Sequence, residues 1–309
     1  MLLISSPRFQ EHTTPPGHPE RPESADVFTA VADAWRDKGV RVIEPRAATR
    51  EELLRVHDAA YVDSIARTSG RAVKLDADTF TSPESYEIAL LAAGATVQAV
   101  EHALDTGEVA CALVRPPGHH AERDTAMGFC LFNNVAVAAA AALARGKSRV
   151  AVVDIDVHHG NGTQWMFYPD PRVLYVSTHQ FPFYPGTGAA AETGSGEGRG
   201  FTFNLPLAAG ATDAEYASAY MAVAARLDEY APELLLISAG YDAHEDDPLA
   251  SMRVTTPGYA AIVRSLRDTA TRIGCPIALV TEGGYDLDAL RACLDATLGI
   301  LSAAPAGGI

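Results

Sequence analysis

One segment combines an apolar run with a dense polar cluster, and it limits the folds open to this chain more than any other. In RVAVVDIDVHHGNG, residues 149–162, a β-branched apolar half precedes two aspartates, two histidines, an asparagine and two glycines. The first half is typical of a strand buried inside a sheet. Because polar groups are costly to bury unless they are paired or bind a ligand, the segment predicts a functional site at the end of this strand.

Short apolar runs alternate with longer helical patterns along nearly the whole chain. This alternation predicts an α/β fold: a mostly parallel eight-stranded sheet with helices on both faces. The expected strands lie at 2–5, 40–45, 109–114, 149–156, 173–178, 201–207, 233–240 and 276–284. The expected helices lie at 24–37, 50–68, 84–105, 133–145, 213–230, 257–273 and 287–302. Residues 1–309 show neither an internal repeat nor a linker, so a single domain is expected.

The charge of the chain excludes some partners. With 39 acidic and 24 basic side chains, the formal net charge is −15. An acidic surface repels the phosphate backbone, so no nucleic-acid partner is expected, whereas cationic substrates would be tolerated. The N-terminal residues do not resemble a signal peptide, and the apolar run at 135–144 is too short to span a bilayer. A cytoplasmic location without a membrane partner is therefore expected.

Four of the expected strands end in polar clusters. The sequences that follow them are RPPGHH at 115–120, DVHHGNG at 156–162, GYDAHEDDP at 240–248 and EGGYD at 282–286. In open α/β sheets, ligands bind beyond the carboxyl ends of the strands. We therefore expect these clusters to converge on one pocket.

Asp154, Asp156 and His158 alternate along an extended segment, so their side chains point to the same side. A carboxylate and an imidazole two residues apart, joined by a distant carboxylate such as Asp242, form a three-ligand metal site. Catalytic zinc uses such a set and leaves a fourth position for water or substrate. The alternative is that these groups cap the next helix or form surface ion pairs.

His119 and His120 follow a Pro-Pro-Gly turn. Beside a metal site, such a pair would supply a general base and an electrostatic partner, whereas on an exposed loop it would do neither. Tyr285 follows two glycines at another strand end, and a phenol aimed at the metal would donate a hydrogen bond to a developing oxyanion. Packing at the rim of the pocket is the alternative for this tyrosine.

Together these motifs resemble the histone deacetylase superfamily. The resemblance rests on GHPERPES, RPPGHHAERDTAMGFCLFNN, DIDVHHGNGTQ, SAGYDAHEDDPLA and EGGYDL, in this order, and it covers essentially the whole chain. The likeness is closer to class II members and to bacterial deacetylase-like and acetylpolyamine amidohydrolase proteins. It implies an arginase-like α/β fold and a metal-dependent amide hydrolase. Zinc is the implied metal, with ferrous iron as the alternative in the cell.

The resemblance assigns a role to each polar residue. The implied metal ligands are Asp156, His158 and Asp242. The implied catalytic residues are His119, His120, Tyr285, Asp154 and Asn161. In this scheme Asp154 orients His119, and Asn161 orients His120, as in class II members. A neutral asparagine favours a neutral His120. That imidazole would take a proton from the attacking water and give one to the leaving amine.

Structural potassium ions are implied by the same resemblance. The inner ion would be held by Ser177 and by main-chain oxygens of Asp154, Asp156, His158 and Thr178. A second, more exposed ion would be held by main-chain oxygens around Phe167, Asp170, Val173 and Phe201.

The substrate channel is expected to be lined by Gly128, Phe129, Tyr184 and Leu249. Phe129 and Tyr184 match the aromatic pair of the family, in which the second residue is commonly phenylalanine. Leu249 stands where polyamine-selective relatives carry a glutamate, which favours an acyl-lysine substrate. Ser24 stands where the family commonly has arginine, so the release of acetate and the acyl length that the site accepts are left open.

The expected reaction is hydrolysis of an N-acetyl or other N-acyl lysine side chain of a protein or peptide. An acetylpolyamine or another small acylated amine is the alternative substrate, which the acidic residues at 245–247 support and Leu249 opposes. A non-catalytic acetyl-lysine binder is a third hypothesis, and the complete set of catalytic residues opposes it. Assembly into a homo-oligomer is left open.

Overall fold

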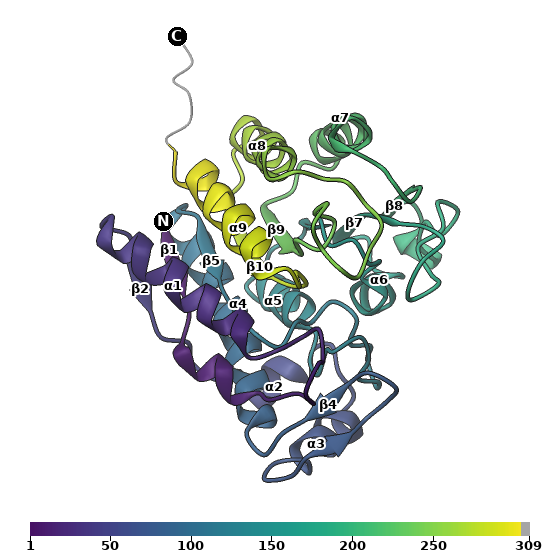
Figure 1. Ribbon diagram of the computed structural model, residues 1–309. Coiled ribbons are helices and arrows are strands. Elements are labelled where there is room, and N and C mark those ends of the chain that lie inside the picture. The colour runs from purple at the N-terminus through teal and green to yellow at the C-terminus, as the bar shows by residue number, and fades with distance from the viewer. Residues whose placement is uncertain (304–309) are drawn as a thin grey trace.

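The computed structural model describes residues 1–303, which are built around an eight-stranded sheet (Figure 1). The strand order is β2-β1-β5-β10-β9-β6-β7-β8, and every neighbouring pair in it is parallel. The strands are β1 (Leu2–Ile4), β2 (Arg41–Ile43), β5 (Ala110–Ala112), β6 (Val150–Asp154), β7 (Val173–Gln180), β8 (Thr202–Leu207), β9 (Leu234–Ala239) and β10 (Ile277–Thr281). The predicted α/β architecture is confirmed. The end of the expected domain, residues 304–309, lies outside the described residues.

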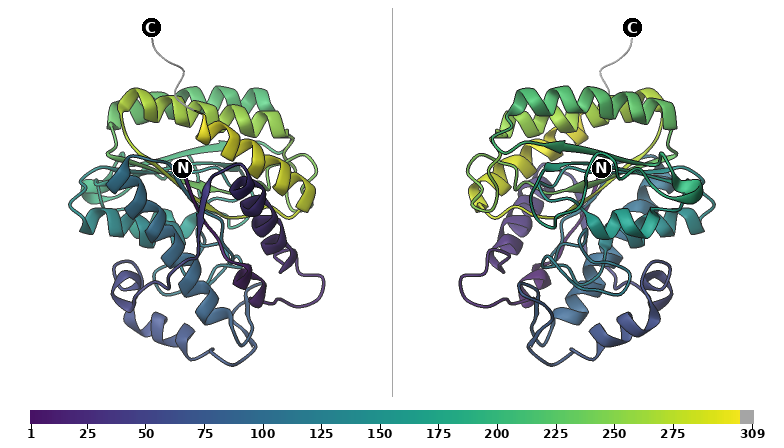
Figure 2. Two further views of the ribbon diagram at one scale, coloured as in Figure 1. Left: turned by 90° about the vertical axis from the view of Figure 1, so that its left-hand side faces the viewer. Right: turned by 90° about the vertical axis from the view of Figure 1, so that its right-hand side faces the viewer.

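Helices cover both faces of the sheet, as the views along its edges show (Figure 2). One face packs against α2 (Arg50–Leu53), α3 (Ala59–Ala66), α4 (Ser85–Thr106), α5 (Asn134–Ala144) and α6 (Asn161–Phe167). The other face packs against α1 (Glu23–Asp37), α7 (Asp213–Tyr230), α8 (Thr256–Ile273) and α9 (Leu287–Ser302). The apolar run at 135–144 lies within buried helix α5. Across residues 1–303, no helix has the length and apolar character needed to cross a membrane.

The position of strand β6 inside the sheet explains why its side chains are apolar on both faces. Val150 and Val152 pack into the core beneath α4 and α5, whereas Ala151 and Val153 pack into the core beneath α7 and α8. Such two-sided burial is typical of a central parallel strand. The four strands that end in polar clusters are neighbours in the order β5-β10-β9-β6, so their carboxyl ends lie side by side at the middle of the sheet.

Three local features differ from the sequence-based expectation. The helix expected over 50–68 is divided into α2 and α3, because the backbone N–H of Asp58 bonds to the carbonyl of Arg123 and the His57 ring contacts the carbonyl of Glu122. Helix α6, a short helix that begins at the end of the polar cluster after β6, was not expected. A small antiparallel hairpin, β3 (Val73–Lys74) with β4 (Phe80–Thr81), was also missed.

Candidate active site

Asp156, His158 and Asp242 lie together beyond the ends of β6 and β9. One ligand atom from each falls within 4.8 Å of the others, and all three residues are buried. His158 Nδ1 is 2.9 Å from Asp242 Oδ2 and 3.2 Å from Asp156 Oδ1. The backbone N–H of Val157 holds Asp242 by donating to its Oδ1 at 2.9 Å. The structure therefore brings the three predicted ligands into one cluster.

The donor set of this cluster suits a divalent cation. Burial and the negative charge of Asp156 raise the pKa of Asp242 to about 7. A cation shared by both carboxylates would offset the repulsion between them. Two carboxylates and an imidazole are also ligand types that zinc accepts at catalytic sites. The residues present therefore fit the metal that the sequence predicts.

Two glycines make room for the ligand carboxylates. A Cβ added at Gly240 would overlap the carboxylate of Asp156, and one added at Gly283 would lie 2.5 Å from Asp242 Oδ2. The backbone N–H of Gly283 instead donates to Asp156 Oδ2 at 2.9 Å. The ligands therefore occupy space that a larger residue at either position would fill.

His119 is paired with Asp154, the last residue of β6. The distance from His119 Nδ1 to Asp154 Oδ2 is 2.9 Å, and the hydroxyl of Tyr175 donates to the same oxygen at 3.2 Å. Burial by itself lowers the pKa of His119, but the carboxylates of Asp154 and Asp156 raise it well above its ordinary value. The paired carboxylate therefore favours the imidazolium form of His119, whose Nε2 lies 3.8 Å from Asp156 Oδ1.

His120 is paired with a neutral partner. Its Nδ1 lies 2.8 Å from Asn161 Oδ1, while Asn161 Nδ2 donates to Glu122 Oε1 at 2.7 Å. Because the Asn161 amide is oriented by Glu122, its oxygen faces His120, whose Nδ1 must carry the hydrogen. Burial and the positive charge of His119 lower the pKa of His120 well below its ordinary value. The neutral form of His120 is therefore favoured, and in this form Nε2 is free to accept a proton.

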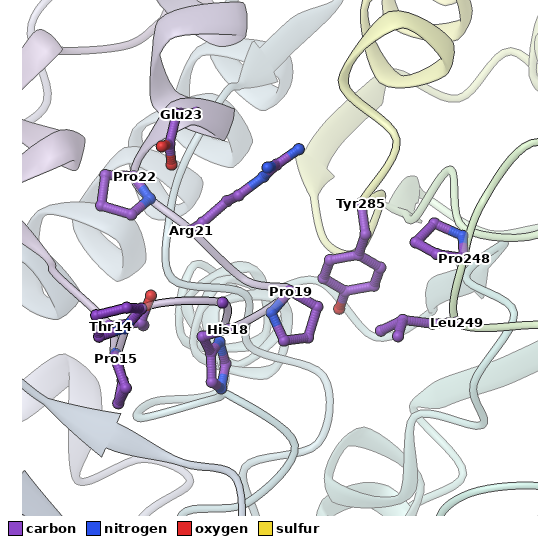
Figure 3. Close-up of a pocket in the computed structure, with 12 residues that line it drawn as sticks. Thr14, Pro15, His18, Pro19, Arg21, Pro22, Glu23, Pro248, Leu249 and Tyr285 are labelled. Carbon is purple, nitrogen blue, oxygen red and sulfur yellow. The ribbon is translucent and has the colours of Figure 1, made fainter.

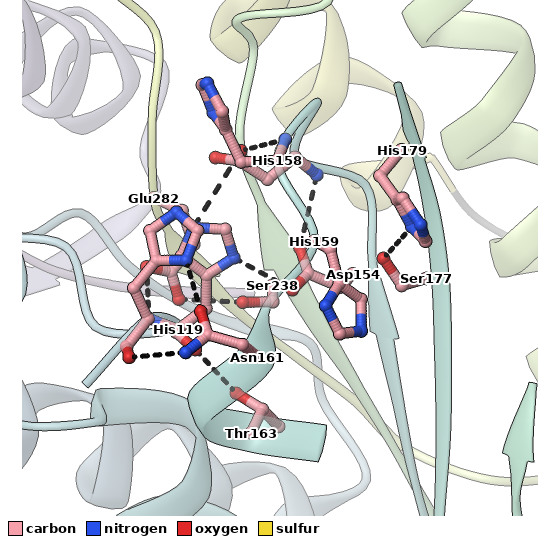
Figure 4. Close-up of polar contacts among 12 residues, drawn as sticks. His119, Asp154, His158, His159, Asn161, Thr163, Ser177, His179, Ser238 and Glu282 are labelled. Carbon is pink, nitrogen blue, oxygen red and sulfur yellow. Dashed lines mark hydrogen bonds and ion pairs between the residues drawn. The ribbon is translucent and has the colours of Figure 1, made fainter. Parts of the chain in front are cut away.

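Glu282 also belongs to the site, although sequence reasoning missed it (Figure 4). Its carboxylate accepts hydrogen bonds from the backbone of Gly118 at 2.6 Å and of His119 at 3.2 Å, and from Ser238 Oγ at 2.7 Å. Burial raises its pKa to about 7, although the nearby imidazolium of His119 opposes this shift. A glutamate at the end of an apolar strand was the available signal. Glu282 fixes the backbone that carries the two histidines.

A hydrogen-bond network that starts at His159, the residue after His158, was also not predicted from the sequence. His159 Nε2 is 2.9 Å from Gln164 Oε1, and Gln164 Nε2 donates to Glu192 Oε2 at 2.6 Å. Glu192 in turn accepts a hydrogen bond from the backbone of Gly188 at 3.0 Å. The network ties the loop after β7, which carries Tyr184, to the base of the site.

Aromatic side chains form the walls of the predicted channel. Gly128 has a φ of 55° and Phe129 a φ of 70°, and a Cβ at Gly128 would overlap the ring of His120. This left-handed turn places the Phe129 ring edge-on to Tyr285, with their centroids 5.9 Å apart. The Tyr184 ring lies 5.2 Å from the ring of His120. Phe183, which the sequence did not single out, stacks on the ring of His158, one of the predicted metal ligands, with their centroids 5.3 Å apart.

The residues predicted to hold potassium lie on adjacent segments. Ser177 pairs with Asp154 across β7 and β6, and its Oγ lies 2.9 Å from His179 Nδ1. Thr178 is the next residue of β7. The remaining predicted residues lie where the chain enters β7 and β8, namely Phe167, Asp170, Val173 and Phe201. Their role in binding potassium stays a prediction.

The rim of the channel is less acidic than the sequence suggests. Asp247, one of the three acidic residues expected to attract a polyamine there, is buried and accepts hydrogen bonds from the backbone of Tyr285 at 2.7 Å and of Leu249 at 3.0 Å. That aspartate therefore supports the loop, and only Glu245 and Asp246 of the acidic run are exposed. Ser24, at the first turn of α1, is buried.

Comparisons with known proteins agree with this arrangement. Residues 18–301 match the family model described as "Histone deacetylase domain". A "Probable deacetylase" of Archaeoglobus fulgidus is 37% identical over 93% of this chain and 81% of its own. "Histone deacetylase 15" of Arabidopsis thaliana is 40% identical over 97% of this chain and 55% of its own. The crystal structure of the HDA15 HD domain superposes with a TM-score of 0.93 at 36% identity, covering 97% of this chain and 90% of that one.

Proposed function

This chain belongs to the histone deacetylase family and is a hydrolytic deacetylase, and we propose that it removes acyl groups from lysine side chains in a zinc-dependent reaction. The observation that carries the proposal is the contrast between the two adjacent histidines. Asp154 favours the imidazolium form of His119, whereas burial and the positive charge of His119 favour the neutral form of His120, whose partner Asn161 is uncharged; both histidines lie beside one buried ligand cluster. Two titratable groups with opposed pKa shifts are typical of an acid–base active site.

Asp156, His158 and Asp242 would hold the zinc ion. When bound, zinc supplies a Lewis acid for the acyl carbonyl and for the water that attacks it. The chain's own residues must then position the amide, move the protons and accommodate the charge that develops on the acyl oxygen.

His120 serves as the general base in this proposal. With the hydrogen on Nδ1 directed to Asn161, Nε2 accepts the proton of the attacking water. The same Nε2 then donates that proton to the nitrogen of the scissile amide, so the amine leaves neutral and the acyl group leaves as a carboxylic acid. One group therefore supplies both proton transfers.

Tyr285 and His119 stabilise the negative charge that develops on the acyl oxygen. Burial and the carboxylates of Asp242 and Asp156 raise the pKa of Tyr285 well above its ordinary value, so its phenol stays protonated and can donate a hydrogen bond. The positive charge of His119 acts through a buried, poorly screened environment. Together they make the transition state bind more tightly than the planar amide.

A lysine side chain suits the channel better than a polyamine does. Leu249, which lies beside Tyr285, is apolar and offers nothing to a second ammonium group. The small acylated amine remains a second candidate because the negative charges of Asp78, Asp76 and Glu122 are near enough to act on Tyr184. A cationic substrate would be attracted to that side.

The test compares kcat/KM for an acetyl-lysine peptide and for N-acetylputrescine, using one zinc-loaded preparation. We expect the peptide to be preferred, and we expect Leu249→Glu to raise the relative rate on N-acetylputrescine by about tenfold, because it adds a carboxylate for the second ammonium. Tyr285→Phe, which removes only the hydroxyl, is the matched control for the chemistry and should lower kcat by about 10²- to 10³-fold. A preference for the polyamine in the unmodified protein would overturn the assignment of substrate.

A further inference from the structure

Tyr285 lines a groove of about 530 Å³ together with residues from two other segments of the chain (Figure 3). One wall is the segment from Thr14 to Glu23, and the other is the loop that carries Pro248 and Leu249. Tyr285, whose phenol faces the acyl group in the proposed function, lies between these two walls. The groove is therefore continuous with the site where a substrate would bind.

Arg21 is the cation of this groove. Its side chain is partly buried, and within residues 1–303 it forms neither an ion pair nor a side-chain hydrogen bond. The neighbouring Glu20 points the other way, where its Oε2 accepts a hydrogen bond from Arg115 Nη2 at 2.8 Å and both side chains are buried. The guanidinium of Arg21 is thus available to a ligand, whereas that of Arg115 is already paired.

The residues around Arg21 favour the binding of an anion. Pro15, Pro19 and Pro22 line the same wall, and apolar walls strengthen a charge–charge contact by excluding water. The chain as a whole carries a net charge of −15, so this free cation does not belong to a generally basic surface. Among the residues that line the groove, the acidic one is Glu23, whose side chain is exposed and forms no ion pair with Arg21.

We propose that Arg21 binds a carboxylate of the substrate that lies next to the acyl-lysine. This inference rests on the proposed function, because it requires that the lysine side chain enter the channel beside Tyr285. The planar guanidinium suits a carboxylate in two parallel hydrogen bonds. The carboxylate belongs either to a neighbouring aspartate or glutamate side chain or to the C-terminus of the substrate itself.

The test uses two matched pairs of substrates. In one pair, acetyl-lysine is flanked by glutamate or by glutamine within an otherwise identical capped peptide. In the other, N-terminally capped acetyl-lysine ends in a free carboxylate or in an amide. The readout is the ratio of kcat/KM for the acidic substrate to that for its neutral partner, which separates charge recognition from general loss of activity.

We expect the unmodified protein to favour the acidic member of at least one pair by about three- to tenfold, which is the range for a partly desolvated charge pair. The pair that shows this preference identifies the source of the carboxylate. Arg21→Gln should bring the ratio to about one or below, and Arg21→Lys should keep part of it. Arg41→Gln, which alters an exposed arginine on edge strand β2, is the matched control and should keep the full ratio.

A ratio of one or below for both pairs in the unmodified protein would overturn the inference, as would a preference that survives Arg21→Gln. Either result leaves the proposed function intact as long as the neutral peptides are hydrolysed. If neither neutral nor acidic acetyl-lysine substrates are turned over, the proposed function itself is wrong. Added potassium chloride should reduce the preference, because salt screens a contact at the surface.

Discussion

Replacing Asn161 by aspartate should shift the pH dependence of catalysis to higher pH. Asn161 Oδ1 lies 2.8 Å from Nδ1 of His120, the proposed general base. The substitution preserves the shape of the side chain and places a negative charge at that distance. A carboxylate this close favours the imidazolium and raises the pKa of a histidine by about 1 to 3 units. His120 would then be protonated, and unable to accept a proton, over a wider range of acidic pH.

A second carboxylate strengthens this effect. Asn161 Nδ2 donates to Glu122 Oε1 at 2.7 Å, so an aspartate at this position would face the carboxylate of Glu122. The repulsion between them is relieved when His120 gains a proton, which moves the pKa in the same direction. In the double variant Asn161→Asp with Glu122→Gln, the repulsion is absent and the glutamine amide can donate in its place. That variant should show a smaller shift and greater stability than the single variant.

The assay is kcat/KM on an acetyl-lysine peptide as a function of pH, which reports the pKa of the base in the free enzyme. We expect the acidic limb to move upward by about 1 to 3 pH units in Asn161→Asp, with the rate falling about tenfold for each unit below the limb. Asn161→Ala removes the hydrogen bond without adding a charge, and its limb should not move upward. An unchanged limb in Asn161→Asp would show that His120 is not the base that the limb reports.

Three further outcomes are expected. Gly240→Ala should reduce the zinc content measured by atomic absorption, because its Cβ would overlap the carboxylate of Asp156; normal zinc content would contradict the proposed crowding. Chelation of the metal should lower the Tm by several degrees in a thermal scan, since Asp156 and Asp242 would then repel each other without a shared cation; an unchanged Tm would show that the metal does not stabilise the fold. Glu20→Gln should cost about 3–5 kcal/mol of unfolding free energy at pH 7, measured with urea, because it leaves the buried charge of Arg115 unpaired. Burial alone raises the pKa of Glu20, but Arg115 lowers it below its ordinary value, so the stabilisation is present above the unfolded-state pKa of about 4.3 and lost as the pH falls. The difference between the two proteins should therefore shrink in acid, and a constant difference would rule out this ion pair as its cause.

The strands of the sheet were predictable because their signal is local. Val150 to Val153 are apolar on both sides, and a strand buried on two faces requires that pattern. The division of the expected helix at 50–68 had no such signal. It depends on hydrogen bonds from Asp58 and His57 to the loop around Glu122, which is far away in sequence.

In the candidate site, too, some residues could be predicted from the sequence and others could not. Asp156 and His158 could be selected as ligands because their spacing in an extended segment sends both side chains to one side. Glu282 was missed because nothing in its neighbourhood reveals that its carboxylate meets the backbone of Gly118 and His119. Asp247 was counted among the acidic residues that would attract a polyamine for the same reason, since its partners at Leu249 and Tyr285 become visible only when two loops are folded together.

The sequence by itself determined the parallel α/β sheet, the edge at which its polar clusters meet and the residue types of the candidate metal site, because periodicity and motif spacing are properties of the chain. The tertiary structure alone decided which groups are charged, paired or free. Arg115 and Arg21 are residues of the same type, yet burial opposite Glu20 makes Arg115 part of a structural ion pair, while Arg21 faces an open groove. Burial and the distance to a partner set the energy of a charge, and only the folded chain defines both.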